Sequence, residues 1–185
     1  MRLFIILLLL SSCNLIEEIK PKHWKTYTIE QGNHYSNGTH IALIESTHID
    51  FKAKFNSSAI YDLGNKSAQT SINKLYGFSD CNSQHHKNSA RFGWLWNVSK
   101  QQLEIYAYVY LHGNVITHYL GNAIIDQEQD YSIYIGTDYY NFNFEGNQVQ
   151  IPRGCNLNNP KYLLYPYFGG NNTAPHQVTI EIKRT

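Results

Sequence analysis

The residues best suited to chemistry are tyrosines that recur at every second position near the middle of the chain. Tyr106, Tyr108 and Tyr110 alternate with aliphatic side chains over residues 103–109. A two-residue period sends alternate side chains to opposite faces of a β-strand, so one face is aliphatic and the other carries the tyrosines. Flat rings with hydroxyl groups suit the CH faces and hydroxyls of a sugar. This tyrosine face, defined by these three residues, is the first candidate binding surface; a second packed layer of side chains is the alternative.

Further candidate side chains come from neighbouring strands and loops. The aromatic residues of the preceding strand share one phase, so Arg91, in the other phase, is predicted to lie on the tyrosine face if those rings are in the core. A polar turn at Asn97–Gln101 joins the two strands. We expect later strands to extend the same surface and a polar loop at residues 79–88 to border it. The additional candidate ligand-binding residues are therefore His86, Asn141, Tyr165 and Tyr167.

An arginine and a histidine beside a cleft could act as charge stabiliser and general base, although an exposed or structural histidine is the alternative. The sequence contains no G-x-S-x-G, no nucleotide-binding glycine loop and no H-E-x-x-H. Nothing therefore supports a serine hydrolase, a kinase or a metalloprotease. Glu104 and Glu145 are the in-strand candidates for the acid pair of a glycoside hydrolase, but no motif joins them. Whether the protein is an enzyme stays open, with a non-catalytic role favoured.

We predict no cofactor and no metal. Asp80, Asn82 and loop carbonyls could hold calcium, but no EF-hand spacing supports such a site. Cys81 and Cys155 lie in turn-like, Asn-rich segments, and an oxidising compartment would permit a disulfide between them. This disulfide is the first interpretation; two free thiols, or a metal site with nearby histidines, are the alternatives.

The amino-terminal residues have the layout of a signal peptide, with one arginine, an apolar run and then small residues before Cys13. The apolar run is too short to span a bilayer. Leu10 to Cys13 resembles the lipobox of bacterial lipoproteins. That resemblance implies cleavage before Cys13, diacylglycerol on its sulfur and an acyl chain such as palmitate on the new amino terminus. We therefore predict a lipoprotein signal at 1–12, a lipidated tether at 13–23 and one domain at 24–185.

This anchor predicts a location in the bacterial cell envelope and a lipid membrane as partner. The acidic pair Glu17-Glu18 loosely resembles a surface-export signal, so the outer membrane or the cell surface is favoured over the inner membrane. The net charge of +1 and the scattered basic residues exclude a nucleic-acid partner, which would need clustered Lys and Arg. A polysaccharide remains a possible partner.

The composition predicts an all-β domain, because β-branched and aromatic residues are abundant and no long helical period occurs. We expect ten to twelve short strands with turns every 8–12 residues, as in a sandwich or barrel. Asn37-Gly38 predicts a hairpin leading into a strand at 40–45. Residues 66–78 are ambiguous between a strand and a short helix, and residues 161–168 are expected to form one strand.

Several sequence strings carry a family resemblance. The runs SARFGWLW, LEIYAYVY, YSIYIGTDYYNFNFEGN and YLLYPYFGG resemble, in order, the second half of a concanavalin A-like jelly roll. This superfamily includes alginate-lyase-type polysaccharide lyases, laminarinase-type hydrolases and lectin-like modules. The strings HHKNSARFGW and YFGGNNTAPH also resemble a group of bacterial envelope lipoproteins. The resemblance implies an antiparallel β-sandwich.

The chain departs from the alginate-lyase pattern at the residues that would matter most. It lacks the R-x-E-x-R, Q-I/V-H and Y-F-K-x-G-x-Y motifs, so no catalytic residue is transferred from that family. The leading hypothesis is a lipid-anchored, carbohydrate-binding β-sandwich that holds a glycan or envelope component on its tyrosine face. A diverged polysaccharide lyase or glycoside hydrolase is the first alternative. A structural lipoprotein that binds another protein is the second.

Overall fold

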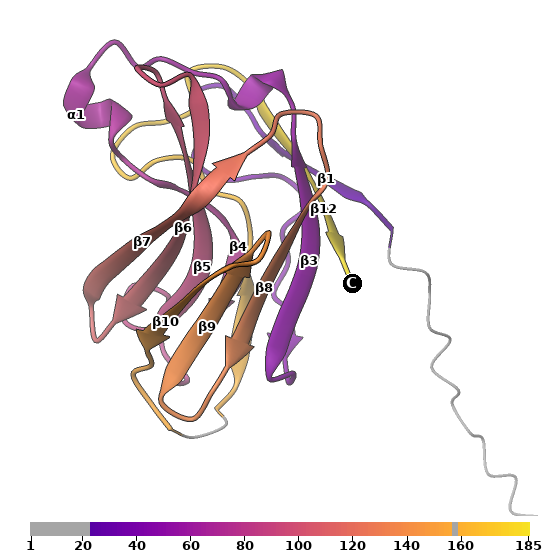
Figure 1. Ribbon diagram of the computed structural model, residues 1–185, viewed down its shortest axis with the longest axis vertical. Helices are drawn as coiled ribbons and strands as arrows, with labels where there is room; N and C mark the ends of the chain where they lie inside the picture. Colours follow the sequence, from indigo (N-terminus) through magenta and orange to yellow (C-terminus); the bar gives the residue numbers. More distant parts are fainter. Residues whose placement is uncertain (1–22, 157–158) are drawn as a thin grey trace, which may run out of the picture.

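The computed structural model describes residues 23–156 and 159–185, which fold into two facing antiparallel sheets (Figure 1). Sheet A contains, in spatial order, β1 (Lys25–Ile29), β12 (Val178–Arg184), β3 (His48–Phe55), β8 (Gln129–Ile135), β9 (Tyr139–Phe144) and β10 (Asn147–Pro152). Sheet B contains β2 (Leu43–Ile44), β11 (Lys161–Leu164), β4 (Asn73–Ser79), β5 (Ser89–Asn97), β6 (Gln102–Leu111) and β7 (Asn114–Ala123). A 3-10 turn, η1 (Ser57–Ala59), and one short helix, α1 (Lys66–Gln69), lie between strands. The predicted all-β sandwich is confirmed.

The core lies between the two sheets and is rich in aromatic rings. Phe92 of β5 packs edge-on against Phe51, Tyr131 and Phe142 of sheet A, with ring centroids 5.7, 5.0 and 5.2 Å apart. These contacts occur because every second residue of β5 points inward. The sandwich thereby buries one face of each sheet. The outer face of sheet B is also largely covered at its centre, because every residue of β4 and all residues of β5 except Asn97 are buried.

The predicted central hairpin is confirmed in register. β5 and β6 pair antiparallel, with Arg91 directly opposite Tyr108 and Ser89 opposite Tyr110. The aliphatic residues of β6 are buried in the core, whereas the tyrosines lie on the outer face of sheet B, away from sheet A. Arg91 therefore shares the tyrosine face, as its phase predicted.

Three expectations about local structure were wrong or incomplete. The Asn37-Gly38 turn does not form a simple hairpin, because the chain there crosses from β1 in sheet A to β2 in sheet B. The expected strand at 161–168 ends at Leu164, and Pro166, which has no N–H to donate, follows it. The ambiguous stretch at 66–78 contains both structures: the single turn α1 and then the strand β4.

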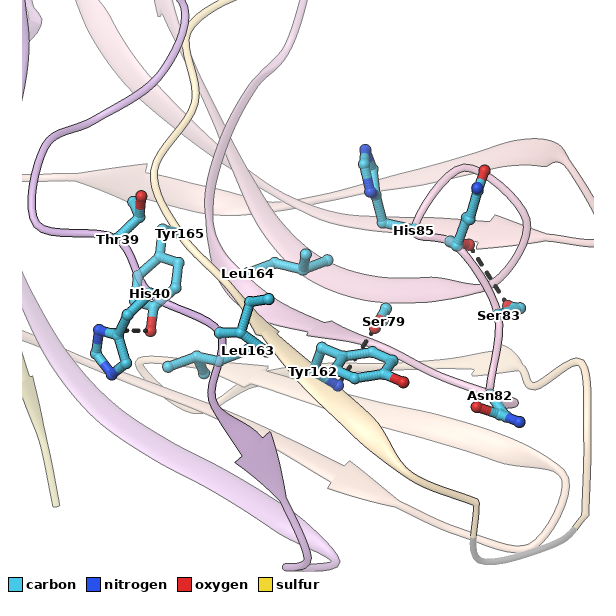
Figure 2. A pocket seen from close by; sticks show the side chains of 12 residues that line it. Thr39, His40, Ser79, Asn82, Ser83, His85, Tyr162, Leu163, Leu164 and Tyr165 are labelled. Carbon is cyan, nitrogen blue, oxygen red and sulfur yellow. Dashed lines mark hydrogen bonds between the residues drawn. The ribbon is translucent and has the colours of Figure 1, made fainter.

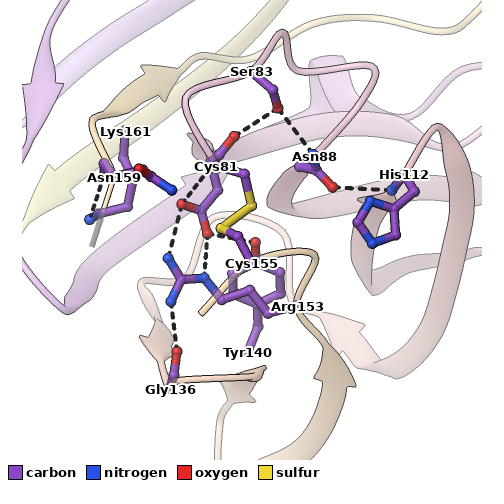
Figure 3. A network of polar contacts seen from close by, with 11 residues as sticks. Cys81, Ser83, Asn88, His112, Gly136, Tyr140, Arg153, Cys155, Asn159 and Lys161 are labelled. Atoms are coloured by element: carbon purple, nitrogen blue, oxygen red, sulfur yellow. Dashed lines mark hydrogen bonds and ion pairs between the residues drawn. A yellow bond between two sulfur atoms is a disulfide. The ribbon is translucent and has the colours of Figure 1, made fainter. Parts of the chain in front are cut away.

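The predicted disulfide between Cys81 and Cys155 is confirmed, with the two Cα atoms 5.7 Å apart (Figure 3). It joins the loop before β5 to the loop after β10. Beside it, Asp80 forms an ion pair with Arg153 at 2.6 Å and accepts a hydrogen bond from Tyr140 at 2.7 Å. This network fixes the base of the polar loop that carries His85 and His86.

Among residues 23–156 and 159–185, no helix is both long and apolar enough to cross a membrane. The predicted signal peptide and Cys13 lie outside the described residues.

Candidate functional site

The tyrosine face is only partly exposed. Tyr108 has 7% of its surface accessible and lies edge-on to Tyr110, with ring centroids 5.8 Å apart. The hydroxyl of Tyr106 donates a hydrogen bond of 2.6 Å to Glu104, and its ring packs against Tyr119 of β7. Tyr106 therefore serves a local side-chain network, whereas Tyr108 and Tyr110 lie next to the basic residues described below.

Arg91 is a buried cation without an acidic partner in the described parts of the chain. The residue is 5% exposed, and its Nε makes no hydrogen bond there. The centre of the guanidinium lies 5.9 Å from the ring centroid of Tyr108, a cation–π contact. Burial lowers the pKa of Arg91 to about 10, so the group stays charged at neutral pH. A buried charge is unfavourable unless an opposite charge or good hydrogen bonds compensate it.

Lys74 of β4 is a second buried cation, and sequence reasoning missed it. Its Nζ lies 4.8 Å from the ring centroid of Tyr108, so Lys74 and Arg91 contact the same ring. The amine donates hydrogen bonds to the carbonyl oxygens of Ile72 and Gly169 at 2.9 and 3.0 Å. Burial, followed by the charge of Arg91, lowers the pKa of Lys74 to about 8.

A β-bulge explains why Lys74 could not be assigned from the sequence. The pairing of β4 with β5 shifts by one residue between Lys74 and Gly77. An unbroken two-residue period would place Lys74 on the same face as the core residues Tyr76 and Phe78. The extra residue of the bulge reverses the phase, so Lys74 lies on the outer face of the sheet instead.

Gly77 makes room for the Arg91 side chain. A Cβ atom at Gly77 would lie 2.1 Å from the carbonyl oxygen of Ala90 and 2.9 Å from Cγ of Arg91. Any side chain at this position would therefore push the neighbouring strand or the arginine away. The absence of a side chain on β4 is what allows Arg91 to lie across the strand.

The polar loop brings both histidines to this surface. His85 and His86 have ring centroids 4.0 Å apart, and His86 packs edge-on against Tyr110. Burial, then the charges of His86 and Arg91, lowers the pKa of His85 to about 4. His85 is therefore uncharged at neutral pH and can accept a proton. The backbone carbonyl of His85 accepts a 2.7 Å hydrogen bond from Ser89, which helps to hold the loop.

Two adjoining hollows lie on this side of the molecule. The cationic hollow, of about 570 Å³, is lined by Lys74, Arg91, His85, His86, Tyr110 and Tyr167, with further residues at its rim. The neutral hollow, of about 920 Å³, lies between the polar loop and residues 39–41, over β11 (Figure 2). The two hollows share wall residues, which are Thr39, His85, Leu163, Leu164 and Tyr165. Together they form one groove.

The three remaining candidate residues, Tyr167, Tyr165 and Asn141, do not all lie at the groove. Tyr167 lines the cationic hollow, where its ring stacks on His34 at 5.2 Å. Tyr165 borders both hollows, but its ring packs against the core residues Tyr27 and Tyr76. Asn141 does not extend the surface: it lies on β9 in sheet A, where it pairs with Tyr134 and Gln150. That expectation was wrong because β9 belongs to the opposite sheet.

Asp80, considered above as a calcium ligand, is fully engaged within the fold. Its carboxylate oxygens bind Arg153, Tyr140 and the backbone N–H of Cys81. Within the described ranges, the one cluster of potential metal ligands is Asp80 with Cys81 and Cys155, and both sulfurs are already in the disulfide. Calcium binding through Asp80 is therefore not supported.

The groove is suited to binding an anion rather than to two-carboxylate chemistry. No Asp or Glu is present among the described residues that line either hollow. Glu104 and Glu145 are on different sheets, since Glu104 is in β6 and Glu145 follows β9. They cannot form the acid pair of a glycoside hydrolase, whose carboxyl groups lie about 5–10 Å apart.

Comparisons with solved structures establish the fold. The alginate lyase AlyC3 superposes with a TM-score of 0.57 at 9% identity, over 85% of this chain and 71% of that one. A GH16 protein from a Bacteroides ovatus mixed-linkage glucan locus, in complex with the product G4G4G3G, gives 0.53 at 11% identity, over 87% and 79%. The alginate lyase from Alteromonas sp. 272 gives 0.53 at 9% identity, over 93% and 90%. No family model and no curated protein matches the sequence.

The class of protein follows from these observations. The chain has the concanavalin A-like jelly-roll fold, and the likeness is structural, at low sequence identity. Its particular feature is a groove that contains two buried cations beside tyrosines, with no acidic residue among the described lining residues.

Proposed function

We propose that this protein binds an anionic polysaccharide in the groove, with Arg91 and Lys74 holding a carboxylate of the sugar. The observation that supports this most strongly is the burial of Arg91 without an acidic partner among the described residues. An uncompensated buried cation weakens a fold by several kcal/mol, so it persists where another role requires it. A bound carboxylate would supply the missing charge and accept the guanidinium hydrogen bonds.

A polysaccharide fits better than a small anion, because two hollows adjoin at the site and tyrosine rings line both of them. Tyr110 and Tyr167 line the cationic hollow, and Tyr162 lines the neutral one. Tyrosine rings bind the apolar faces of sugars while their hydroxyls remain free to hydrogen-bond. The solved structures that share the fold include proteins named as alginate lyases and one bound to a glucan product.

Calorimetry with uronate oligosaccharides and neutral glucan oligosaccharides tests this proposal. We expect the uronate oligomers to bind, and Arg91→Gln to weaken that binding by about tenfold or more, since a charged hydrogen bond contributes roughly 1.5–3 kcal/mol. Lys183→Gln, which removes the same charge from β12 in the other sheet, is the matched control and should bind normally. Equal affinity for neutral and anionic oligomers, or an Arg91→Gln variant that binds like the parent, would contradict the proposal.

Anchoring through Cys13 is part of the proposal and is supported by the lipobox-like sequence at residues 10–13. Two or more acyl chains would hold the domain stably at the outer membrane or the cell surface. Metabolic labelling with a fatty-acid precursor should mark the protein in cells but not a Cys13→Ala variant. Equal labelling of both proteins would exclude lipidation at this residue.

A polysaccharide lyase is the second candidate, favoured by the lowered pKa of Lys74 beside Arg91. Arg91 could neutralise a uronate carboxylate, which acidifies the proton on the neighbouring carbon. The neutral form of Lys74, which is populated as pH approaches 8, can accept that proton, whereas His85, with its pKa lowered to about 4, is the weaker base. The electron pair left on carbon forms the double bond as the glycosidic C–O bond of the next carbon breaks, and the departing oxygen takes a proton from water. An increase in ultraviolet absorbance from an unsaturated sugar product would establish this activity. If ultraviolet absorbance does not rise on polymers that the protein binds, the protein has the binding function without the lyase activity.

A further inference from the structure

The two hollows of the groove differ in charge although they share a wall. Lys74 and Arg91 line only the cationic hollow. Among the described residues that line the neutral hollow, there is no Lys, Arg, Asp or Glu. His85 stands between the hollows, and it is uncharged at neutral pH. Among the described lining residues, Lys and Arg are thus confined to one end of the groove.

The neutral hollow is lined by the groups that suit an uncharged sugar. The ring of Tyr162 lies on its floor, and the side chains of Asn82, Ser83 and His85 project from the polar loop above (Figure 2). The backbone N–H of Tyr162 is held by Ser79 at 3.2 Å, which fixes the strand that carries the ring. An aromatic floor with amide and hydroxyl groups on one side offers stacking and hydrogen bonds without charge.

From this asymmetry we infer that the groove takes a heteropolysaccharide in which a carboxylated sugar is followed by a neutral one. The inference rests on the proposed function and specifies its substrate class. A carboxylate placed in the neutral hollow would be partly desolvated beside Leu163, Leu164 and the Tyr162 ring, with no Lys or Arg among the described lining residues to compensate it. An uncharged sugar in the same place loses no ionic hydration. A polymer with a carboxylate on every unit therefore fits this groove less well than an alternating one.

Two hexasaccharides of similar length but different charge pattern test the inference. One comes from hyaluronan, in which uronate and N-acetylhexosamine alternate, and the other from polymannuronate, in which every unit is a uronate. We expect the alternating oligomer to bind about tenfold more tightly, although it has half as many carboxylates. Tighter binding of the polymannuronate oligomer would overturn the inference and leave the proposed function intact. Failure of both oligomers to bind would remove the proposed function itself.

A variant that adds a cation to the neutral hollow gives an independent result. Gln84 is exposed and lines this hollow, so Gln84→Lys should increase the affinity for the polymannuronate oligomer and leave the alternating one nearly unchanged. Gln148→Lys on the exposed edge strand β10 is the control for net charge. Tyr162→Ala should weaken binding of the alternating oligomer, and Tyr162→Phe should recover the part of the affinity that comes from ring stacking. An equal gain for both oligomers in Gln84→Lys, matched by Gln148→Lys, would show a general charge effect and overturn the inference.

Discussion

Among the residues that the structure describes, two arginines have almost completely covered side chains, and the surroundings of these side chains are opposite in charge. The side chain of Arg153 is 5% exposed and pairs with the fully buried carboxylate of Asp80. Arg91 is also 5% exposed, but no acidic side chain of the described structure compensates it. Although burial alone would lower the pKa of Arg153, its hydrogen bond and ion pair with Asp80 raise it, whereas burial lowers the pKa of Arg91.

The contrast separates a structural cation from a ligand-binding one. Arg153 connects the base of the polar loop, through Asp80, to Tyr140 of sheet A, and the disulfide lies beside this ion pair. Arg91 and Lys74 form no ion pair with any residue that the structure describes, and both line the cationic hollow. The first arrangement contributes to stability. The second arrangement leaves two positive charges available to bind an anionic ligand.

Loss of the paired arginine should have the largest effect on stability. Arg153→Met leaves the Asp80 carboxylate buried without its partner, which destabilises folded proteins by about 3–5 kcal/mol. Urea unfolding of the oxidised protein measures this change. Lys52→Met, which breaks a solvent-exposed pair with Asp130, is the control and should change stability little. A midpoint for Arg153→Met equal to that of the control would mean that the ion pair does not stabilise the fold.

The space beneath Arg91 should tolerate a side chain poorly. Gly77→Ala adds a Cβ 2.1 Å from the carbonyl oxygen of Ala90, so the strands must separate locally. Overpacking of this kind costs about 1–3 kcal/mol, and it should also weaken binding of uronate oligomers because Arg91 moves. Gly170→Ala is the matched control for stability, since its Cβ would meet only the hydroxyl of Ser71, at 3.3 Å. Normal stability together with normal binding in Gly77→Ala would contradict this account.

Removal of Arg91 should increase stability, whereas removal of Arg153 should decrease it. Arg91→Met replaces an uncompensated buried charge by an apolar side chain of similar length, so the free energy of unfolding should rise by about 1–4 kcal/mol. The same variant should lose uronate binding. Thermal unfolding and calorimetry on one preparation give both values. A variant that is less stable and still binds would reverse the roles assigned to the two arginines.

Much of this comparison could be predicted from the sequence, because it depends on strand alternation. The phase of β5 and β6 placed Arg91 on the tyrosine face, and the register Arg91 to Tyr108 confirms it. A disulfide was the first of three interpretations of Cys81 and Cys155, and the structure contains it. These features depend on local periodicity and on a pair of cysteines, and both can be recognised from the order of residues alone.

The remainder depends on long-range geometry. A one-residue bulge in β4 reverses the alternation of inward and outward side chains at Lys74, and no residue in that stretch predicts the bulge. Asn141 has the right type and phase, but the order of strands puts β9 in the other sheet. The pairing of Asp80 with Arg153 joins residues from two loops that only the finished sandwich brings together.

The affinity for uronate oligomers should also depend on pH, through Lys74, the second buried cation of the cationic hollow. The pKa of Lys74 is lowered to about 8, so its charge is lost as pH rises through that value. The affinity for uronate oligomers should therefore fall by about tenfold above pH 8, in line with the loss of one charged hydrogen bond. A Lys74→Arg variant, which keeps its charge, should show no such fall. A pH-independent affinity in the parent protein would exclude Lys74 from the carboxylate site.

Stability without ligand should change in the other direction over the same range. Because the pKa of Lys74 falls from 10.5 in the unfolded chain to about 8 in the folded one, the unfolded chain holds more protons between these values. Stability therefore rises with pH in this window as far as Lys74 contributes, and Lys74→Met should reduce the slope. Above about pH 10 the raised pKa of buried tyrosines such as Tyr61 opposes this trend. Affinity and stability that move in opposite directions distinguish a ligand-binding cation from a structural one, for which both would fall together.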